Sequence, residues 1–167
     1  ISNGLDNIIE HIKNFKFTDE DIDYLRKEGL SEEFLKYLKN LKFTGDISAV
    51  LDGTPVFPNE PVITVRAPII EAQIIETAIL SHFNHASLVT TAAKRITNEA
   101  KNIPVMEFGA RRARGTSSAN EASKYAYIGG CVGTSNVYAA KEYNIPAMGT
   151  MAHSMIEAFD TEYEAFM

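Results

Sequence analysis

The spacing of apolar residues divides the chain into three regions with different predicted elements. Across residues 5–41, apolar side chains recur at helical intervals. Thr18 and Ser31 stand where helix N-caps are expected, and Gly29 stands where a helix would end. This region therefore predicts short amphipathic helices with solvated charged faces.

The period changes in residues 42–67, where strand-like stretches are interrupted by the turn dipeptides DG and PN. We expect two or three antiparallel strands there. Residues 69–100 return to a helical period, with apolar side chains around much of the circumference. A helix of that kind is typical of a protein core, so we expect it to be largely buried.

The region after Lys101 alternates short strands with helices. The strands are predicted in PVMEF, GCV and PAM, each followed by a turn and a helical segment, the last of them MAHSMIEAF. This order predicts an α/β protein with a parallel sheet or barrel, whose chemistry lies in the loops at the strand ends. If the strands are parallel neighbours, their three loops share one rim. We place the domain boundary between residues 1–102 and residues 103–167.

Composition narrows the classes of protein. Of the 167 residues, 45% are hydrophobic and 23% are charged, as in an ordinary globular domain. The net charge of −6 argues against a nucleic-acid binder, and no apolar run approaches the ~20 residues of a membrane span. Cys131 is the only cysteine, which excludes an intrachain disulfide and a cysteine-rich zinc site and favours a reducing, cytoplasmic location.

Both ends of the sequence have the pattern of positions inside a longer chain. The sequence begins with ISNGLDN, which has neither a methionine nor the features of a signal peptide. It stops within the helix-like EAFDTEYEAFM without a cap. We therefore expect a fragment.

Polar loops after the predicted strands hold the candidate chemistry. The first, EFGARRARG, places Arg111, Arg112 and Arg114 close together in sequence. It predicts either an anion site or a solvated loop with local ion pairs. The second, GTSN, precedes a helix whose N-terminus either binds an anion or is merely capped by one of the three polar residues.

The third loop, GTMAHS, contains a histidine. With Thr150 as the N-cap, His153 would lie in the first turn of a helix, where the helix dipole disfavours the imidazolium form. A neutral imidazole near arginines could accept a phosphoryl group, and a hydrogen-bonded structural role is the alternative. His82 and His85 have no acidic neighbour at helical spacing and are interpreted as structural or surface groups, so no metal site is predicted.

With these motifs in place, the chain resembles the nicotinate phosphoribosyltransferase family. The resemblance covers roughly residues 42–166 and follows the family order through VITVRAPIIEAQIIETAILSHFNHASLVTTAAKRI, EFGARRARG, GTSNVYAAKEYNIPAMGTMAHS and FDTEYEAF. It implies an enzyme of NAD salvage that transfers the phosphoribosyl group of phosphoribosyl pyrophosphate to the ring nitrogen of nicotinate. It also implies coupled ATP hydrolysis and assistance by Mg²⁺.

The resemblance implies roles for five residues. His153 matches the histidine that is transiently phosphorylated, and Thr150 matches a position that contacts nicotinate. Phe108 matches an aromatic residue that stacks on the pyridine ring in the related nicotinamide enzyme, and Arg111 matches an arginine near the same pocket. Ser135 stands where the nicotinamide enzyme has an acidic residue, which would repel nicotinate, so Ser135 favours nicotinate as the base.

The implied fold is an open-faced α/β sandwich packed on an irregular α/β barrel, with the site completed by the second subunit of a homodimer. The present chain offers the sandwich layer and only the first βα units, whereas a barrel of eight units takes about 250 residues. We therefore expect this truncated, type II phosphoribosyltransferase-like chain to be inactive alone. Its open sheet edge and apolar faces predict that it self-associates or needs the missing half of the barrel.

Other interpretations stay open: a nicotinamide-using or quinolinate-using relative, and a non-catalytic binding or scaffold module that keeps the first half of the fold. The quinolinate enzymes work without a phosphorylated histidine, so GTMAHS disfavours them. The truncated length favours the scaffold module, whereas the intact EFGARR and GTMAHS motifs disfavour it.

Overall fold

The chain opens with three short helices: α1 (Leu5–Asn14), α2 (Asp19–Lys27) and α3 (Glu32–Lys39). The structure is a computed structural model that describes residues 1–167. The two predicted caps are confirmed. The Thr18 hydroxyl accepts from the Asp21 N–H at 3.2 Å, and the Asp21 carboxylate accepts from the Thr18 N–H at 2.7 Å. Ser31 caps α3 by accepting from the Phe34 N–H at 3.3 Å.

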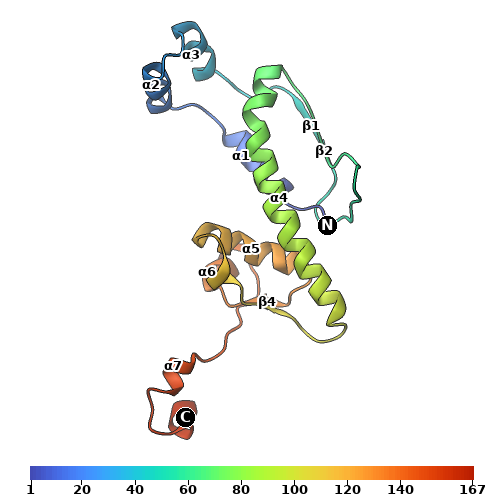
Figure 1. The fold of residues 1–167 in the computed structure, drawn as a ribbon, viewed down its shortest axis with the longest axis vertical. Coiled ribbons are helices and arrows are strands. Elements are labelled where there is room, and N and C mark those ends of the chain that lie inside the picture. Colours follow the sequence, from blue (N-terminus) through green and yellow to red (C-terminus); the bar gives the residue numbers. More distant parts are fainter. The chain divides into compact units, whose positions relative to one another are not determined.

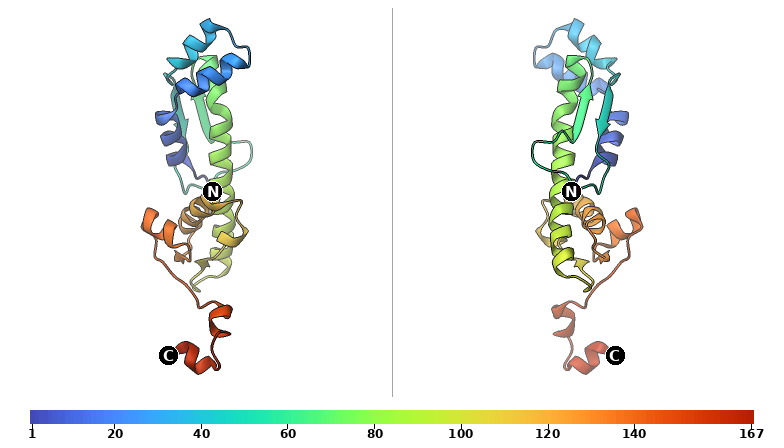
Figure 2. Two further views of the ribbon diagram at one scale, coloured as in Figure 1. Left: turned by 90° about the vertical axis from the view of Figure 1, so that its left-hand side faces the viewer. Right: turned by 90° about the vertical axis from the view of Figure 1, so that its right-hand side faces the viewer.

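A β-hairpin and a long helix follow (Figure 1). Strands β1 (Asp46–Ala49) and β2 (Ile63–Arg66) pair antiparallel, with Asp46 opposite Arg66, so this region contains two strands. Helix α4 (Ile69–Glu99) has 31 residues. Figure 2 shows α1 and the hairpin lying along the first part of α4.

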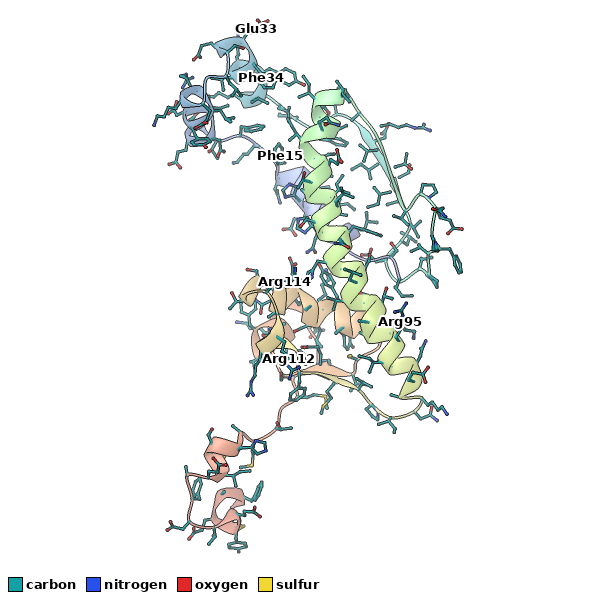
Figure 3. The ribbon with its side chains drawn as sticks, in the orientation of Figure 1. Phe15, Glu33, Phe34, Arg95, Arg112 and Arg114 are labelled. Atoms are coloured by element: carbon teal, nitrogen blue, oxygen red, sulfur yellow. The ribbon has the colours of Figure 1, made fainter.

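Two compact units make up the chain, unit 1 with residues 1–91 and unit 2 with residues 92–167. Two clusters of apolar side chains hold unit 1 together. One forms between α2 and α3 around Leu35, and Phe15 packs against it (Figure 3). In the other, Ile8 of α1 packs with α4 and the hairpin. Removal of this apolar surface from water is the main force that stabilises unit 1.

The prediction that α4 is largely buried is wrong. Ile75 and Ala86 are buried, but Leu80 and Leu88 are 59% and 63% exposed. The elements packed on α4 cover only part of its circumference, and apolar side chains elsewhere on the helix face solvent. An apolar pattern around a helix predicts burial only where neighbouring elements are present to cover it.

The first residues of the chain are anchored on α4. The Asn3 amide donates to the Thr90 hydroxyl at 2.6 Å, and both side chains are buried. Gly4 has a φ of 107°, and a Cβ at this position would lie 2.9 Å from the Ala86 Cβ and 3.0 Å from the His82 carbonyl oxygen. Backbone conformation and the close approach of α4 therefore both require glycine here.

The α2–α3 pair is expected to lose stability in acid. The Lys39 ammonium holds the pKa of Asp19 below its ordinary value, and hydrogen bonds from Thr18 do the same for the pKa of Asp21. A carboxyl whose pKa is lower in the folded state favours folding above its unfolded pKa, about 4. That contribution is lost as the pH falls through the folded pKa. Urea unfolding followed by circular dichroism should give a lower midpoint at pH 3 than at pH 7.

The Asp21→Asn variant separates the cap from other acid effects. It keeps the size of the side chain and removes its titration, so the difference between its midpoints at pH 7 and pH 3 should be smaller than in the wild type. Equal differences in the two proteins would contradict the role given to Asp21.

Unit 2 is built on short parallel strands. Strand β3 (Met106–Glu107) pairs with β4 (Gly133–Thr134), and Thr134 forms a further parallel bridge with Ala147. The strand predicted in PVMEF is therefore confirmed, and PAM contributes one bridge. The strand predicted in GCV is displaced, since β4 starts at the glycine that follows this tripeptide.

The connections of unit 2 are a 3₁₀ turn and four helices: η1 (Ala110–Arg112), α5 (Thr116–Ile128), α6 (Val137–Tyr143), α7 (His153–Ile156) and α8 (Glu162–Phe166). Helix α5 packs against η1, α6 and the strands, whereas α7 packs against α8 after an extended segment (Figure 1). The continuous helix predicted in MAHSMIEAF is wrong. Only its first turn is helical, because bends and turns separate α7 from α8.

The compact units divide between Thr91 and Ala92, within α4. The domain boundary at residues 102–103 stays a prediction. No helix combines the length and the apolar character needed to cross a membrane.

Candidate functional site

Three strand ends lie side by side at one edge of unit 2. Because β3, β4 and the Ala147 bridge are parallel neighbours, the loops after Glu107, Thr134 and Ala147 leave from the same edge. The shared rim expected from the sequence is therefore confirmed. In parallel α/β structures this edge is where ligands bind.

A pocket of about 490 Å³ opens beside the first two loops. Its walls come from η1, the start of α5 and the start of α6. Ser135 and Asn136 line it from one loop, and Ala110, directly before Arg111, lines it from the other. A pocket of this size accommodates a small molecule. The structure thus brings Ser135 and the arginine turn to one pocket.

Asn136 is the residue that caps α6. Its Oδ1 accepts from the Ala139 N–H at 3.1 Å, while its Nδ2 donates to the Asn120 Oδ1 of α5 at 2.8 Å. Ser135 is half-buried and has no capping role. Since Asn136 satisfies the helix terminus, the Ser135 hydroxyl is left for another function.

The arginines of the first loop form no ion pair within the 167 residues. Arg111, Arg112 and Arg114 are exposed, and none of them takes part in the salt bridges of α2 and α3. Figure 3 shows Arg112 and Arg114 in the segment between β3 and α5. Local ion pairs are thus ruled out as the explanation for this cluster. Phe108, 41% exposed, directly precedes the loop.

Sequence reasoning missed Glu107, whose carboxylate accepts hydrogen bonds from Ser123 and Thr134. The available signal was an acidic residue inside the otherwise apolar strand PVMEF. Burial raises the pKa of the nearby Cys131 thiol, and the negative charge of Glu107 raises it further. Cys131 is 7% exposed, so it is an inert part of the packing beneath the site.

Thr150 and His153 follow the third strand end and are exposed. His153 begins α7, so its place in a first helical turn is confirmed. The prediction that Thr150 caps this helix is wrong: Ala152 is at the N-cap, and no side chain caps it. The helix has only 4 residues, too few for the helix dipole that the sequence argument assumed. No hydrogen bond joins Thr150 or His153 to the pocket residues.

The other histidines lie in unit 1. The rings of His11 and His82 are 5.6 Å apart and tilted, and His11 also contacts Phe15. This packing fits the structural interpretation of His82. Nowhere in the 167 residues do three or more His, Cys, Asp or Glu side chains gather as metal ligands would.

Comparison with known proteins decides the family. Residues 1–84 match the model of the nicotinate phosphoribosyltransferase N-terminal domain, and residues 103–166 match that of the nicotinate phosphoribosyltransferase family. The chain belongs to the nicotinate phosphoribosyltransferase family. The resemblance read from the sequence is thereby confirmed.

Relatives from distant organisms match nearly the whole chain. Nicotinate phosphoribosyltransferases of Mycobacterium tuberculosis and Bacillus subtilis are each 46% identical to it over 164 residues, 98% of this chain. That of Caenorhabditis elegans is 45% identical over 96% of the chain. The chain spans about a third of the length of these relatives, with 35%, 34% and 30% of each covered.

Solved structures of family members and relatives share the fold. The human nicotinic acid phosphoribosyltransferase superposes with a TM-score of 0.87 at 31% identity, over 95% of this chain and 33% of that one. A nicotinate-nucleotide pyrophosphorylase from Pyrococcus furiosus gives a TM-score of 0.71 at 33% identity, over 82% and 35%. The α/β, phosphoribosyltransferase-like fold predicted from the sequence is confirmed.

Proposed function

We propose that these residues form part of the active site of a nicotinate phosphoribosyltransferase, which makes nicotinate mononucleotide from nicotinate and phosphoribosyl pyrophosphate. The observation that carries the proposal is the arginine turn without carboxylate partners, beside the Ser135 pocket at the parallel strand ends. Guanidinium groups in such a place suit a carboxylate or phosphate ligand.

In this proposal each candidate residue has a distinct task. Arg111 faces the nicotinate carboxylate, and the half-exposed Phe108 stacks on its ring. Ser135 and Thr150 contact the base. His153 accepts the terminal phosphoryl group of ATP, which couples ATP hydrolysis to turnover. The transfer passes through a cationic ribosyl centre with diphosphate leaving, so the protein acts mainly by positioning these groups.

The residues of this chain do not fit a Mg²⁺ site of their own, because no cluster of metal-ligating side chains exists. In the proposal Mg²⁺ is bound by the substrate phosphates, as is common for this ion, and no step depends on it here. A cytoplasmic homodimer is part of the same proposal.

A base-preference assay tests the function. The full-length product of the gene that carries these residues should convert nicotinate and phosphoribosyl pyrophosphate to nicotinate mononucleotide. In Ser135→Asp the new carboxylate repels that of nicotinate, so kcat/KM for nicotinate should fall by about 100-fold or more, and that for nicotinamide should fall less. Steady-state kinetics with both bases measures this.

The matched control is Ser135→Asn, which is close to Asp in size and carries no charge. It should lose much less nicotinate activity than Ser135→Asp. Equal losses would contradict the electrostatic role of position 135. Absence of nicotinate mononucleotide with the wild-type protein would contradict the proposed function itself. The isolated 167-residue chain is expected to be inactive and serves as the blank.

A further inference from the structure

One carboxylate, that of Glu107, is hydrogen-bonded to elements around the candidate pocket. The Glu107 Oε2 accepts from the Thr134 hydroxyl at 2.6 Å and from the Ser123 hydroxyl at 2.9 Å, and its Oε1 accepts from the Gly109 N–H. These donors come from β4, from α5 and from the turn before η1. One side chain therefore ties together the elements that form the pocket walls.

The bonds extend to the pocket lining itself. The Glu107 carbonyl accepts from the Ser135 N–H at 3.0 Å, and the Thr134 hydroxyl accepts from the Asn136 N–H at 3.0 Å. Ser135 and Asn136 both line the pocket. On the other side, Gly109 directly precedes Ala110, which lines it too. Both halves of the pocket are thus held by Glu107.

Glu107 is satisfied by neutral donors and not by the neighbouring arginines. It takes part in no salt bridge, although three arginines follow it closely in the sequence. Ser123 and Thr134 are fully buried, each with 0% exposure, so their hydroxyl groups are fixed in place. An ionised carboxylate makes strong hydrogen bonds to such donors. The arginines consequently stay available for a ligand.

We propose that Glu107 is a positioning residue for the base: it sets the spacing between the Arg111 turn and Ser135, and thereby the affinity for a pyridine carboxylate. This inference rests on the proposed function. A purely structural role would instead lower the amount of folded enzyme and affect both substrates alike. The two roles differ in their effect on the KM values.

The test compares Glu107→Ala with Glu107→Gln in the full-length gene product. Loss of all three hydrogen bonds in Glu107→Ala should raise the KM for nicotinate by about tenfold or more and leave the KM for phosphoribosyl pyrophosphate within about twofold. In Glu107→Gln the amide oxygen can still accept from Gly109. The Ser123 hydroxyl, at 3.0 Å from the Ala119 carbonyl, can turn its proton there, and the Thr134 hydroxyl can turn its proton to the Ser123 Oγ at 3.2 Å. Both hydroxyl oxygens can then accept from the new amide. Most of the nicotinate affinity should therefore return.

Glu142→Ala, an exposed change on α6, is the control and should leave both KM values unchanged. Equal KM changes for both substrates in Glu107→Ala, unchanged KM values, or no recovery in Glu107→Gln would overturn the inference. If Glu107→Ala does not fold, the Ser123→Ala variant tests the inference instead, because it removes only one of the donors to Glu107. In Ser123→Ala, a KM for nicotinate raised about threefold supports the inference, and an unchanged KM for nicotinate overturns it. A wild-type enzyme without transfer activity would instead refute the proposed function.

Discussion

His153→Ala is expected to abolish the ATP-dependent phosphoryl labelling of the full-length protein. In the proposed step a ring nitrogen of His153 forms a bond to the terminal phosphorus of ATP, and ADP leaves. The side chain is exposed at the start of α7, so it is accessible to a nucleotide. Incubation with ATP labelled in the terminal phosphate, followed by quantification of protein-bound label, measures the effect.

Two further variants make this result specific. His85→Ala changes a histidine of unit 1 and should keep the label. His153→Gln keeps a polar side chain of similar size without a nucleophilic ring and should lose it. Label that survives in His153→Ala would show that another residue accepts the phosphoryl group.

Gly133→Ala is expected to destabilise unit 2 strongly. A Cβ at this position would lie 2.7 Å from the Pro146 carbonyl oxygen and 2.7 Å from the Met148 sulfur. The same Pro146 carbonyl accepts from the Thr134 N–H at 3.1 Å, and the Met148 N–H donates to the Thr134 carbonyl at 2.9 Å. The added methyl group must push this segment away, which breaks the parallel bridge.

Overpacking costs about 1–3 kcal/mol and each lost hydrogen bond about 1 kcal/mol, so we expect a loss of about 2–4 kcal/mol in the free energy of unfolding. Urea unfolding of the chain, followed by circular dichroism, measures it. Gly149→Ala is the matched control, since its Cβ would meet no atom within 4 Å. Similar midpoints for the two variants would contradict the close approach at Gly133.

Local signals in the sequence were sufficient for much of the fold. Thr18 and Ser31 cap their helices because each needs only the N–H three residues ahead. The parallel order of the strand ends also follows from local alternation of strands and helices. The prediction that Thr150 is a helix N-cap was wrong because the chain after Ala147 is extended, and α7 begins only at His153.

Features that depend on residues distant in the sequence could not be predicted from the sequence pattern. The exposure of Leu80 and Leu88 depends on which elements cover α4, and the hydrophobic periodicity of the helix does not show which elements these are. The partners of Glu107 lie 16 and 27 residues away, at Ser123 and Thr134, so no local sequence motif predicts these hydrogen bonds. The position of Ser135 in the pocket wall could be expected from its loop, but its lack of a capping role required the structure.

The anchoring of Asn3 on Thr90 also constrains how the protein folds during synthesis. The two residues are 87 positions apart in sequence, and their hydrogen bond closes unit 1. Contacts of such long sequence separation form late and slow folding. Unit 1 therefore cannot complete on the ribosome until α4 has emerged as far as Thr90.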